Sequence, residues 1–370
     1  MGFELEKIFG LFDTEFDFAS GAPISTGHIN DTFLITAECG RRFVLQRINH
    51  HVFPSPSDVM ENKVKVSEHL KTKRVENSEN RTLTFFKAKG GGFLATDETG
   101  NAWNLMLYID GSRVHLKTPN ALVAKEAGKA FGGFLRDTSD LNPALFSETL
   151  ERFHSMSHRF EQYDAALANA KPERINRAAD HIAYVREQRE SMLILDRLTG
   201  EGAIPFRVTH NDTKISNALF SHDDKALCVI DLDTVMRGVV HYDFGDAVRT
   251  ICSGADEDEP DESKIVFNME YFRAFTDGFL GASGLELSER ELETLALSAK
   301  IMTFIIGLRM LTDFLNNDIY FETKYEEHNL VRARNQFIFA RLIEKNLPEM
   351  NAVVEEIYRG RIKASANSDR

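Results

Sequence analysis

The sequence has few cysteines, a single tryptophan and no long uninterrupted hydrophobic segment. Its three cysteines, Cys39, Cys228 and Cys252, are far apart and form no CxxC pair. We therefore expect neither a disulfide framework nor a cysteine zinc site, and the usage fits a reducing cytoplasm. No run of 18 or more apolar residues is present, and the N-terminal segment carries acids where a secretory signal needs an apolar core. Neither a membrane span nor a secretory signal is expected.

Basic residues are outnumbered by acidic ones, 44 to 57. The net charge is -13 and the pI is near 5.5, and no basic patch of the kind that nucleic-acid binders carry stands out. An acidic protein can still bind ATP where local cations and a metal ion offset the phosphates. A chain of 370 residues is long enough for two lobes around sizeable cores. We expect a monomer that binds small molecules.

The pattern of residues changes once along the chain and predicts an α+β, bilobal protein. Residues 1–109 read as a small β-rich lobe that binds nucleotide, and residues 110–370 as a larger, mainly helical lobe that carries the catalytic loop and the acceptor site. In the first lobe we expect one helix with Ser57 as its N-cap, and Trp103 in the core. The expected strands are residues 32–36, 42–48, 82–87, 93–95 and 102–109. The main helices expected in the second lobe are residues 147–167, 172–198, 264–280, 288–315 and 325–346.

Chemistry is most clearly indicated at His210-Asn211-Asp212-Thr213-Lys214-Ile215-Ser216-Asn217. Protein kinases use the spacing H-x-D-x-x-x-x-N in their catalytic loop, where Asp receives the acceptor's proton and Asn holds magnesium. Lys214 is placed to meet the transferring phosphoryl group, and His210 reads as structural. Asp231 ends an apolar run and Asp233 follows, which puts hard oxygen ligands for Mg²⁺ at the end of a strand. We predict Asp212 and Lys214 as catalytic residues, and a metal site of the remaining three: Asn217, Asp231 and Asp233.

A second kinase-like triplet, Asp243-Phe244-Gly245, has the wrong spacing for the same purpose. It lies too far after Asn217 to supply the metal ligand, a place that Asp231 already fills. We expect Asp243 to brace the helix that begins near it and to bond back to the catalytic loop.

These motifs resemble those of the aminoglycoside phosphotransferase and choline kinase superfamily, whose fold is related to protein kinases. Within it, the stretches 208–214, 229–236 and 242–249, together with Gly238, are similar to N-acetylhexosamine 1-kinases. The resemblance implies that ATP, with Mg²⁺, phosphorylates the anomeric hydroxyl of an amino sugar, GlcNAc or GalNAc.

The nucleotide side is predicted from three segments of the first lobe. Gly27 and His28 lie between two expected strands, where kinases place the loop that covers the phosphates, although an ordinary hairpin turn fits equally well. Kinases carry a lysine on the next strand, and this chain has Gln46 in that place. Arg47, Lys63, Lys65, or Gln46 with magnesium alone could take over its role. The adenine would meet the strand end at Met106, Leu107 and Ile109, of which at least one is expected to be plain core.

The acceptor side is predicted on the apolar helix that ends near Leu315. Arg309 and Asp313 interrupt it at i,i+4, so they either pair with each other or reach toward the sugar. Arg309 and Tyr320, together with Asp212 and His28, are the expected substrate-binding residues. The acidic run at residues 256–262 reads as a solvated loop, which a cationic aminoglycoside could exploit.

Three other functions stay open. The chain could be a kinase of another small alcohol, such as an aminoglycoside, an amino alcohol or another sugar. A protein kinase is disfavoured, because no A-P-E sequence follows Asp231. A silent nucleotide-binding regulator would explain the missing lysine, but not the intact Asp212, Asn217 and Asp231.

Overall fold

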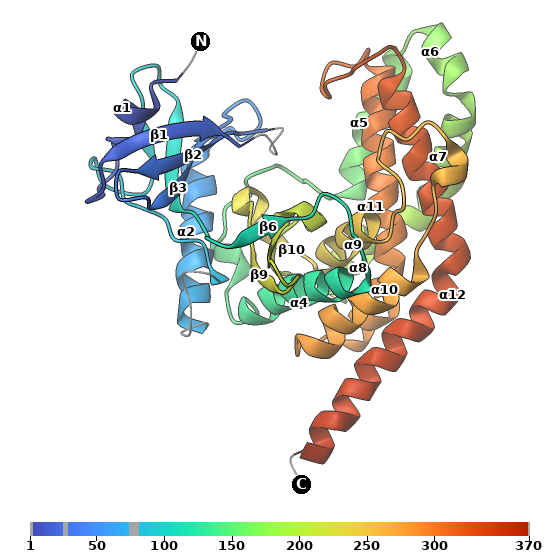
Figure 1. Ribbon diagram of the computed structural model, residues 1–370. Coiled ribbons are helices and arrows are strands. Elements are labelled where there is room, and N and C mark those ends of the chain that lie inside the picture. The colour runs from blue at the N-terminus through green and yellow to red at the C-terminus, as the bar shows by residue number, and fades with distance from the viewer. Residues whose placement is uncertain (1–2, 25–28, 74–80, 369–370) are drawn as a thin grey trace.

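The computed structural model describes residues 3–24, 29–73 and 81–368, and these form two lobes of different make-up (Figure 1). The smaller lobe is built on a five-stranded antiparallel sheet, and the larger one is mainly helical. The strand order is β1-β2-β3-β5-β4, with β1 at Phe18–Pro23, β2 at Asp31–Ala37, β3 at Arg42–Ile48, β5 at Ala102–Leu107 and β4 at Ala95–Thr96. This is the α+β bilobal, kinase-like architecture that the sequence predicts.

The core of the small lobe lies between the sheet and helix α1 (Leu5–Phe9). Phe43 and Leu45 of β3 are fully buried there beside Trp103 of β5, because alternate residues of a strand point to one face. The indole of Trp103 also donates a hydrogen bond of 2.8 Å to Asp97. The prediction of Trp103 as a core residue is confirmed.

Helix α2 (Pro56–Lys73) follows β3 and packs against Leu232–Thr234 of the larger lobe. Val59, Val66 and Leu70 are buried along one side of it, as the spacing predicts. The prediction of Ser57 as N-cap is wrong, because the backbone carbonyl of Ser55 accepts the first helical bonds and the helix starts at Pro56. Proline is favoured in the first turn, where its missing N–H has no partner to lose.

Residues 82–87 do not form the expected strand. Only isolated bridges are present here, between Phe85 and Met106 and between Ala88 and Phe12. Leu83 and Phe85 are nevertheless buried, in the cluster that also contains Met60 and Val66 of α2. Their alternation therefore reflects burial against a helix and not continuous strand pairing.

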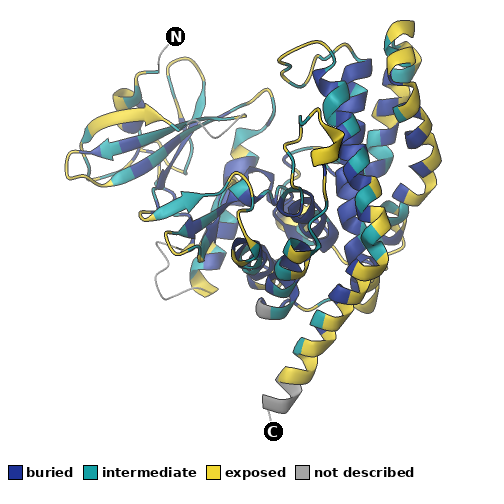
Figure 2. Cartoon of the chain, turned by 45° about the vertical axis from the view of Figure 1, so that its right-hand side comes forward, coloured by how far each residue is buried: buried dark blue, intermediate teal, exposed yellow. Residues whose placement is uncertain are grey.

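The larger lobe is a set of helices around α11 (Glu289–Leu315), which contacts α5, α9 and α12. Figure 2 shows the buried residues concentrated in these central helices, whereas the C-terminal end of α12 projects into solvent. The capping box of Ser288 and Glu291 starts α11. By length and composition α11 could cross a membrane, but 83% of its apolar window is buried inside the fold. The other helices are α4 (Ala121–Asp137), α5 (Met156–Asn169), α6 (Pro172–Arg177), α7 (Ala179–Met192), α8 (Ile194–Gly200), α9 (Val240–Ile251), α10 (Met269–Thr276) and α12 (His328–Ser368).

Four of the expected helices differ from the observed ones, and the one expected at residues 264–280 begins only at Met269. The helix predicted at 147–167 begins only at Met156, because Ser155 caps it and Asp196 accepts the amides of its first residues. The stretch 172–198 divides into the three helices α6, α7 and α8. The last helix runs to Ser368, far past the predicted end, and continues through Pro348.

Five short strands in the larger lobe position the catalytic segments. They are β6 (Ser112–Val114), β7 (Arg207–Thr209), β8 (Ala218–Ser221), β9 (Ala226–Val229) and β10 (Met236–Gly238). β6, β8 and β9 form one antiparallel sheet, and β7 pairs with β10. The predicted division between residues 109 and 110 falls between β5 and β6, the first strand of the larger lobe.

Candidate active site

β7 leads directly into the catalytic loop, and its pairing with β10 fixes where that loop begins. Thr209 lies opposite Met236 and donates its side-chain hydrogen bonds to the Met236 carbonyl and to Asn211. Gly238 is next to this contact, and a Cβ atom there would come within 2.1 Å of the Thr209 hydroxyl. Only glycine fits at this position without moving the start of the loop.

His210 is a structural residue, as predicted. It is fully buried, and the rings of Phe131 and Phe134 meet it edge-on. Its Nε2 lies 2.9 Å from the Ile230 carbonyl, and the amide of Asp212 donates to its Nδ1. These partners require the neutral tautomer with the proton on Nε2. His210 thereby ties the catalytic loop to the chain just before Asp231.

Asp243, in the first turn of α9, braces the same loop. Its two carboxylate oxygens accept the backbone amides of His210 at 2.9 Å and Asn211 at 2.7 Å, and its own carbonyl accepts the Thr213 hydroxyl. The side chain is completely buried, and burial raises the pKa of Asp243 to about 6. The expectation that this Asp-Phe-Gly triplet bonds back to the loop is confirmed.

Asp212, Lys214 and Asn217 meet as the spacing predicts. Lys214 Nζ lies 3.0 Å from Asp212 Oδ2, and the Asn217 amide donates to the same oxygen at 2.9 Å. Burial raises the pKa of Asp212, but the charge of Lys214 and the hydrogen bonds from Lys214 and Asn217 outweigh it, so the net pKa is lowered. The Asp212 carboxylate raises the pKa of Lys214 in turn. Asp212 is therefore ionised at neutral pH and Lys214 is charged.

Asp231 comes directly after β9 and Ile230, beside Asn217. The Ile230 amide donates to the Asn217 carbonyl at 2.9 Å. Asp231 itself adopts the left-handed conformation, with φ 61° and ψ 58°, a strained geometry for a residue with a side chain. Its side chain reaches solvent, yet protein atoms surround it closely enough to limit its hydration. That desolvation, with Asp233 and Asp212 as negative neighbours, raises the pKa of Asp231 to about 7.

Asn217 and Asp231 fit a magnesium site of the kind that substrate phosphates complete. No described donor bonds the Asp231 carboxylate or the side-chain oxygen of Asn217, so both are free to act as ligands. Among the described residues no group of three or more His, Cys, Asp or Glu side chains could hold a metal by itself. Mg²⁺ in kinases needs only one or two carboxylates together with phosphate oxygens and water. Metal binding by these residues stays a prediction.

Asp233 has different surroundings from Asp231. It is 2% exposed, and both of its carboxylate oxygens have partners. Lys63 Nζ lies 2.6 Å from one oxygen, and the Asn30 amide donates to the other. The prediction that Asp233 binds metal stays untested, but a metal would have to compete with these two partners.

Gln46 occupies the strand position at which kinases carry a lysine, and a lysine from α2 meets it there. Lys63 Nζ donates to Gln46 Oε1 at 2.9 Å, and the Asn104 amide holds the same oxygen at 3.2 Å. Of the other candidates, Arg47 pairs with Asp31, and Lys65 bonds Glu61 and the Leu145 carbonyl. The structure thus places one cation, Lys63, beside Gln46.

The strand end expected to meet adenine divides into two faces. Leu107 packs in the small lobe's own core with Phe43, so it is the plain core residue of the three. Met106 and Ile109 belong to the cluster that links the lobes, so they are the pair available to flank a base. Adenine binding by them stays a prediction. Gly27 and His28 lie outside the described residues.

Of the two alternatives left open for Arg309 and Asp313, the pairing with each other is wrong, and substrate binding by Arg309 stays a prediction. Asp313 accepts the amides of Tyr320 and Phe321, each at 2.9 Å, and so fixes the turn after α11. The guanidinium of Arg309 instead lies over the rings of Phe153 and Phe321, 5.5 Å from each centroid. No carboxylate pairs with Arg309 in the described part of the chain.

His154 links Arg309 to the catalytic loop, a connection that the sequence did not reveal. Its ring packs on Phe153, and its Nε2 lies 2.8 Å from the carbonyl of Asn211, next to Asp212. Burial, followed by the charges of Arg309 and Arg159, lowers the pKa of His154 to about 3. It is therefore neutral and donates from Nε2. Tyr320 lies on the turn after α11 and is 65% exposed.

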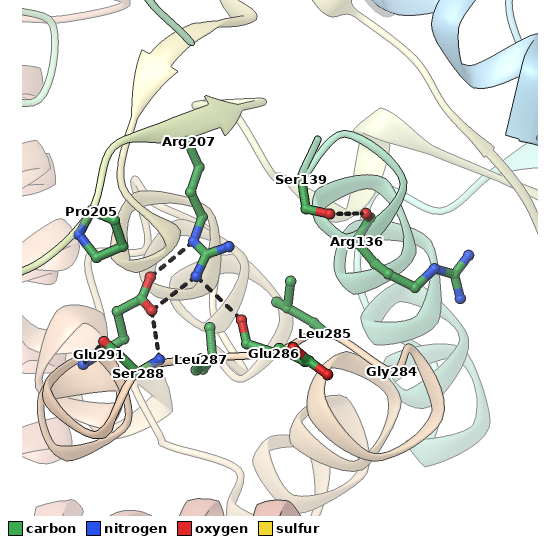
Figure 3. A pocket seen from close by; sticks show the side chains of 10 residues that line it. All are labelled: Arg136, Ser139, Pro205, Arg207, Gly284, Leu285, Glu286, Leu287, Ser288 and Glu291. Carbon is green, nitrogen blue, oxygen red and sulfur yellow. Dashed lines mark hydrogen bonds and ion pairs between the residues drawn. The ribbon is translucent and has the colours of Figure 1, made fainter. Parts of the chain in front are cut away.

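A separate pocket of about 600 Å³ lies at the opposite end of β7 from the catalytic loop (Figure 3). Arg207 and Glu291 meet directly in its lining, where two hydrogen bonds of 2.9 Å join them. The guanidinium also reaches the Glu286 carbonyl. None of the predicted site residues lines this pocket. Its lining residues are Arg136, Ser139, Pro205, Arg207, Gly284, Leu285, Glu286, Leu287, Ser288 and Glu291.

The fold and the arrangement around Asp212 define a kinase-like phosphotransferase. A profile described as the phosphotransferase enzyme family matches residues 20–278, more than half of the chain. The protein belongs to this family. It is a small-molecule kinase whose acceptor group is a hydroxyl, and ATP with a divalent metal ion fits its family.

Solved structures share this architecture over nearly the whole chain. A microcompartment-associated aminopropanol kinase is 15% identical, with a TM-score of 0.61, and the match covers 94% of this chain and 98% of that one. An amicoumacin kinase solved with AMP-PNP and Ca²⁺ is 14% identical, with a TM-score of 0.61 and coverage of 91% and 92%. A choline kinase from Cryptosporidium parvum Iowa II is 14% identical, with a TM-score of 0.51 and coverage of 90% and 93%. At such identities the likeness establishes the fold alone.

Proposed function

We propose that the protein transfers the γ-phosphoryl group of ATP, with Mg²⁺, to the anomeric hydroxyl of an N-acetylhexosamine, GlcNAc or GalNAc. The products are the sugar 1-phosphate and ADP. The observation that carries phosphoryl transfer is the meeting of Asp212, Lys214, Asn217 and Asp231 at the ends of β7 and β9. The choice of sugar rests on the residues flanking these motifs and on the charge of the acceptor side.

Each residue of the catalytic group has a separate role in the proposed reaction. The ionised Asp212 orients the sugar hydroxyl and receives its proton as the hydroxyl oxygen bonds to the γ-phosphorus and the bond to ADP breaks. Lys214, held 3.0 Å from Asp212, presents positive charge where the transferring group passes. Asn217 and Asp231 would hold Mg²⁺, which neutralises charge that develops on the phosphate oxygens.

The charge of the acceptor side favours an uncharged acceptor over a cationic one. Arg309 has no carboxylate partner among the described residues, and Arg159 beside it bonds only the Phe153 carbonyl and Gln162. Two unneutralised guanidinium groups repel a choline-like or aminoglycoside cation, whereas they can donate to sugar hydroxyls or an acetamido carbonyl. Tyr320, on the turn after α11, adds an exposed aromatic ring.

The acidic run at residues 256–262 does not offer a cationic acceptor a free surface. Most of its acids already have basic partners. These pairs are Asp256 with Lys117, Glu257 with Arg249, Asp258 with Lys324, Glu259 with Lys264, and Glu262 with Arg334.

The test is an acceptor panel with purified protein and Mg·ATP. ADP release is measured with GlcNAc, GalNAc, glucose, ethanolamine, choline and an aminoglycoside, and ³¹P NMR assigns the phosphorylated position. We expect turnover with an N-acetylhexosamine and an anomeric phosphate. Turnover of an amino alcohol or aminoglycoside with none for either N-acetylhexosamine would refute the choice of acceptor.

The Asp212→Ala protein tests the catalytic assignment in the same assay. Removing a positioned base costs about 10²- to 10⁴-fold in rate. A folded Asp212→Ala protein that binds nucleotide and keeps full activity contradicts the role given to Asp212. Tight nucleotide binding by the unmodified protein without transfer to any acceptor would favour a silent regulator instead.

A further inference from the structure

Lys63 is a buried cation at the junction of the lobes, and its environment is built to hold it there. The residue is 1% exposed. Its ammonium group donates to Gln46 at 2.9 Å and to Asp233 at 2.6 Å, and it lies 5.7 Å from the centroid of the Phe85 ring. Lysine is rarely buried without a strong reason, because removing its charge from water is costly.

The position of Lys63 relates it to the phosphates rather than to the sugar. Gln46 is the β3 residue at which kinases place the lysine for the α- and β-phosphates. Asp233 follows the predicted metal ligand Asp231 by two residues, and Lys63 forms an ion pair of 2.6 Å with Asp233. Asn30, at the end of the loop between β1 and β2, bonds Asp233 from the other side. Lys63 therefore lies where β3, Asn30 and the segment of the predicted metal site meet.

We propose that Lys63 supplies, from helix α2, the positive charge for the nucleotide phosphates that β3 lacks, with Gln46 and Asp233 holding its ammonium group in place. The inference rests on the proposed use of ATP. An ammonium group has three N–H donors and two of them have acceptors here, so one remains for a phosphate oxygen. The usual arrangement of a strand lysine facing a helix acid is thus replaced by a strand glutamine facing a helix lysine.

Nucleotide binding without any sugar tests this directly. Affinities of Mg·AMP-PNP, Mg·ADP and adenosine are measured by calorimetry for the unmodified protein and for Lys63→Met, with thermal unfolding followed by circular dichroism. Loss of a charge-assisted bond lowers affinity for both phosphorylated ligands by about 10- to 100-fold. Adenosine affinity is expected to stay unchanged. Equal affinity of Lys63→Met for Mg·AMP-PNP, or an equal loss for adenosine, overturns the proposal.

Two further variants make the result decisive. Lys65→Met removes a lysine on the same helix that bonds Glu61 and a backbone carbonyl, and it is expected to leave all three affinities unchanged. Lys63→Met leaves Asp233 buried without its cation, so it can fail to fold. In that event the exchange Gln46→Lys with Lys63→Gln decides, because it returns a cation to the same place. Affinity for Mg·AMP-PNP within a few-fold of the unmodified protein supports the proposal, and a selective loss overturns it.

The failure of this inference differs from a failure of the proposed function. An unmodified protein that binds no Mg·AMP-PNP overturns both. If the unmodified protein binds Mg·AMP-PNP and Lys63→Met binds it equally well, only the role of Lys63 is overturned. The acceptor panel is independent of either outcome.

Discussion

Replacing Asp243 by asparagine tests whether this residue braces the catalytic loop or binds metal. Its two oxygens accept the amides of His210 and Asn211 at 2.9 and 2.7 Å. Asparagine keeps one acceptor and turns an NH₂ group toward the other buried amide. A lost bond to a charged group and an unsatisfied buried donor together destabilise the fold by about 3 kcal/mol. A shift of Asp212 by about 1 Å lowers kcat by roughly 100-fold.

The assay is urea unfolding together with the dependence of activity on Mg²⁺ concentration. A brace lowers stability and kcat and leaves the Mg²⁺ requirement unchanged. Asp261→Asn is the matched control, because Asp261 also accepts a backbone amide, that of Ser263, but on an exposed loop. It is expected to change stability by less than about 1 kcal/mol. Unchanged stability of Asp243→Asn with a raised Mg²⁺ requirement would refute the brace and indicate a ligand.

Three other substitutions give separate outcomes. Gly238→Ala places a Cβ atom 2.1 Å from the Thr209 hydroxyl, so we expect a loss of about 1–3 kcal/mol in urea unfolding, against almost none for Gly200→Ala, where the space is open. Burial lowers the pKa of His241 to about 4. His241 therefore does not destabilise the fold above pH 6.5. Between pH 6.5 and 4 the free energy of unfolding falls with pH, because only the unfolded chain takes up the proton there. His241→Leu should therefore reduce the slope of stability against pH in that window by about 1.4 kcal/mol per pH unit, and an unchanged slope contradicts the assignment. Arg309→Met should raise the KM of the acceptor by about 10- to 100-fold with an unchanged KM for ATP, and a rise in the KM for ATP instead would move Arg309 out of the acceptor side.

Much of the catalytic group follows from sequence because its geometry is local. His210, Asp212 and Asn217 lie within one short loop, so their spacing determines which side chains can meet. The spacing of Asp243 is equally informative, since it disfavours a metal role and predicts the bonding back to the loop that the structure shows. Residue type gave Trp103 its place in the core. In each of these examples the deciding interaction is either short-range or purely a matter of burial.

The remaining features depend on contacts between distant segments. Nothing in the neighbourhood of Lys63 marks it among the lysines of α2, because its role arises only when β3 and Asp233 pack against that helix. His154 was missed for the same reason, since its partner is the carbonyl of Asn211. The helix expected from residue 147 begins later because Asp196, a distant side chain, fixes its start. Periodicity contains no information about such partners.

The ion pairs around the catalytic group also bear on the choice between a neutral and a cationic acceptor. Asp246 and Glu257, acids close to Lys214, both pair with Arg249, whereas no carboxylate in the described ranges pairs with Arg309. Asp246 and Glu257 are therefore compensated, whereas Arg159, on the proposed acceptor side with Arg309, bonds the Phe153 carbonyl and Gln162 and no carboxylate among the described residues. A cationic acceptor would have to approach these guanidinium groups, which is electrostatically unfavourable in a partly buried site. A neutral sugar needs only hydrogen bonds, and a guanidinium held between two aromatic rings supplies these in a fixed orientation.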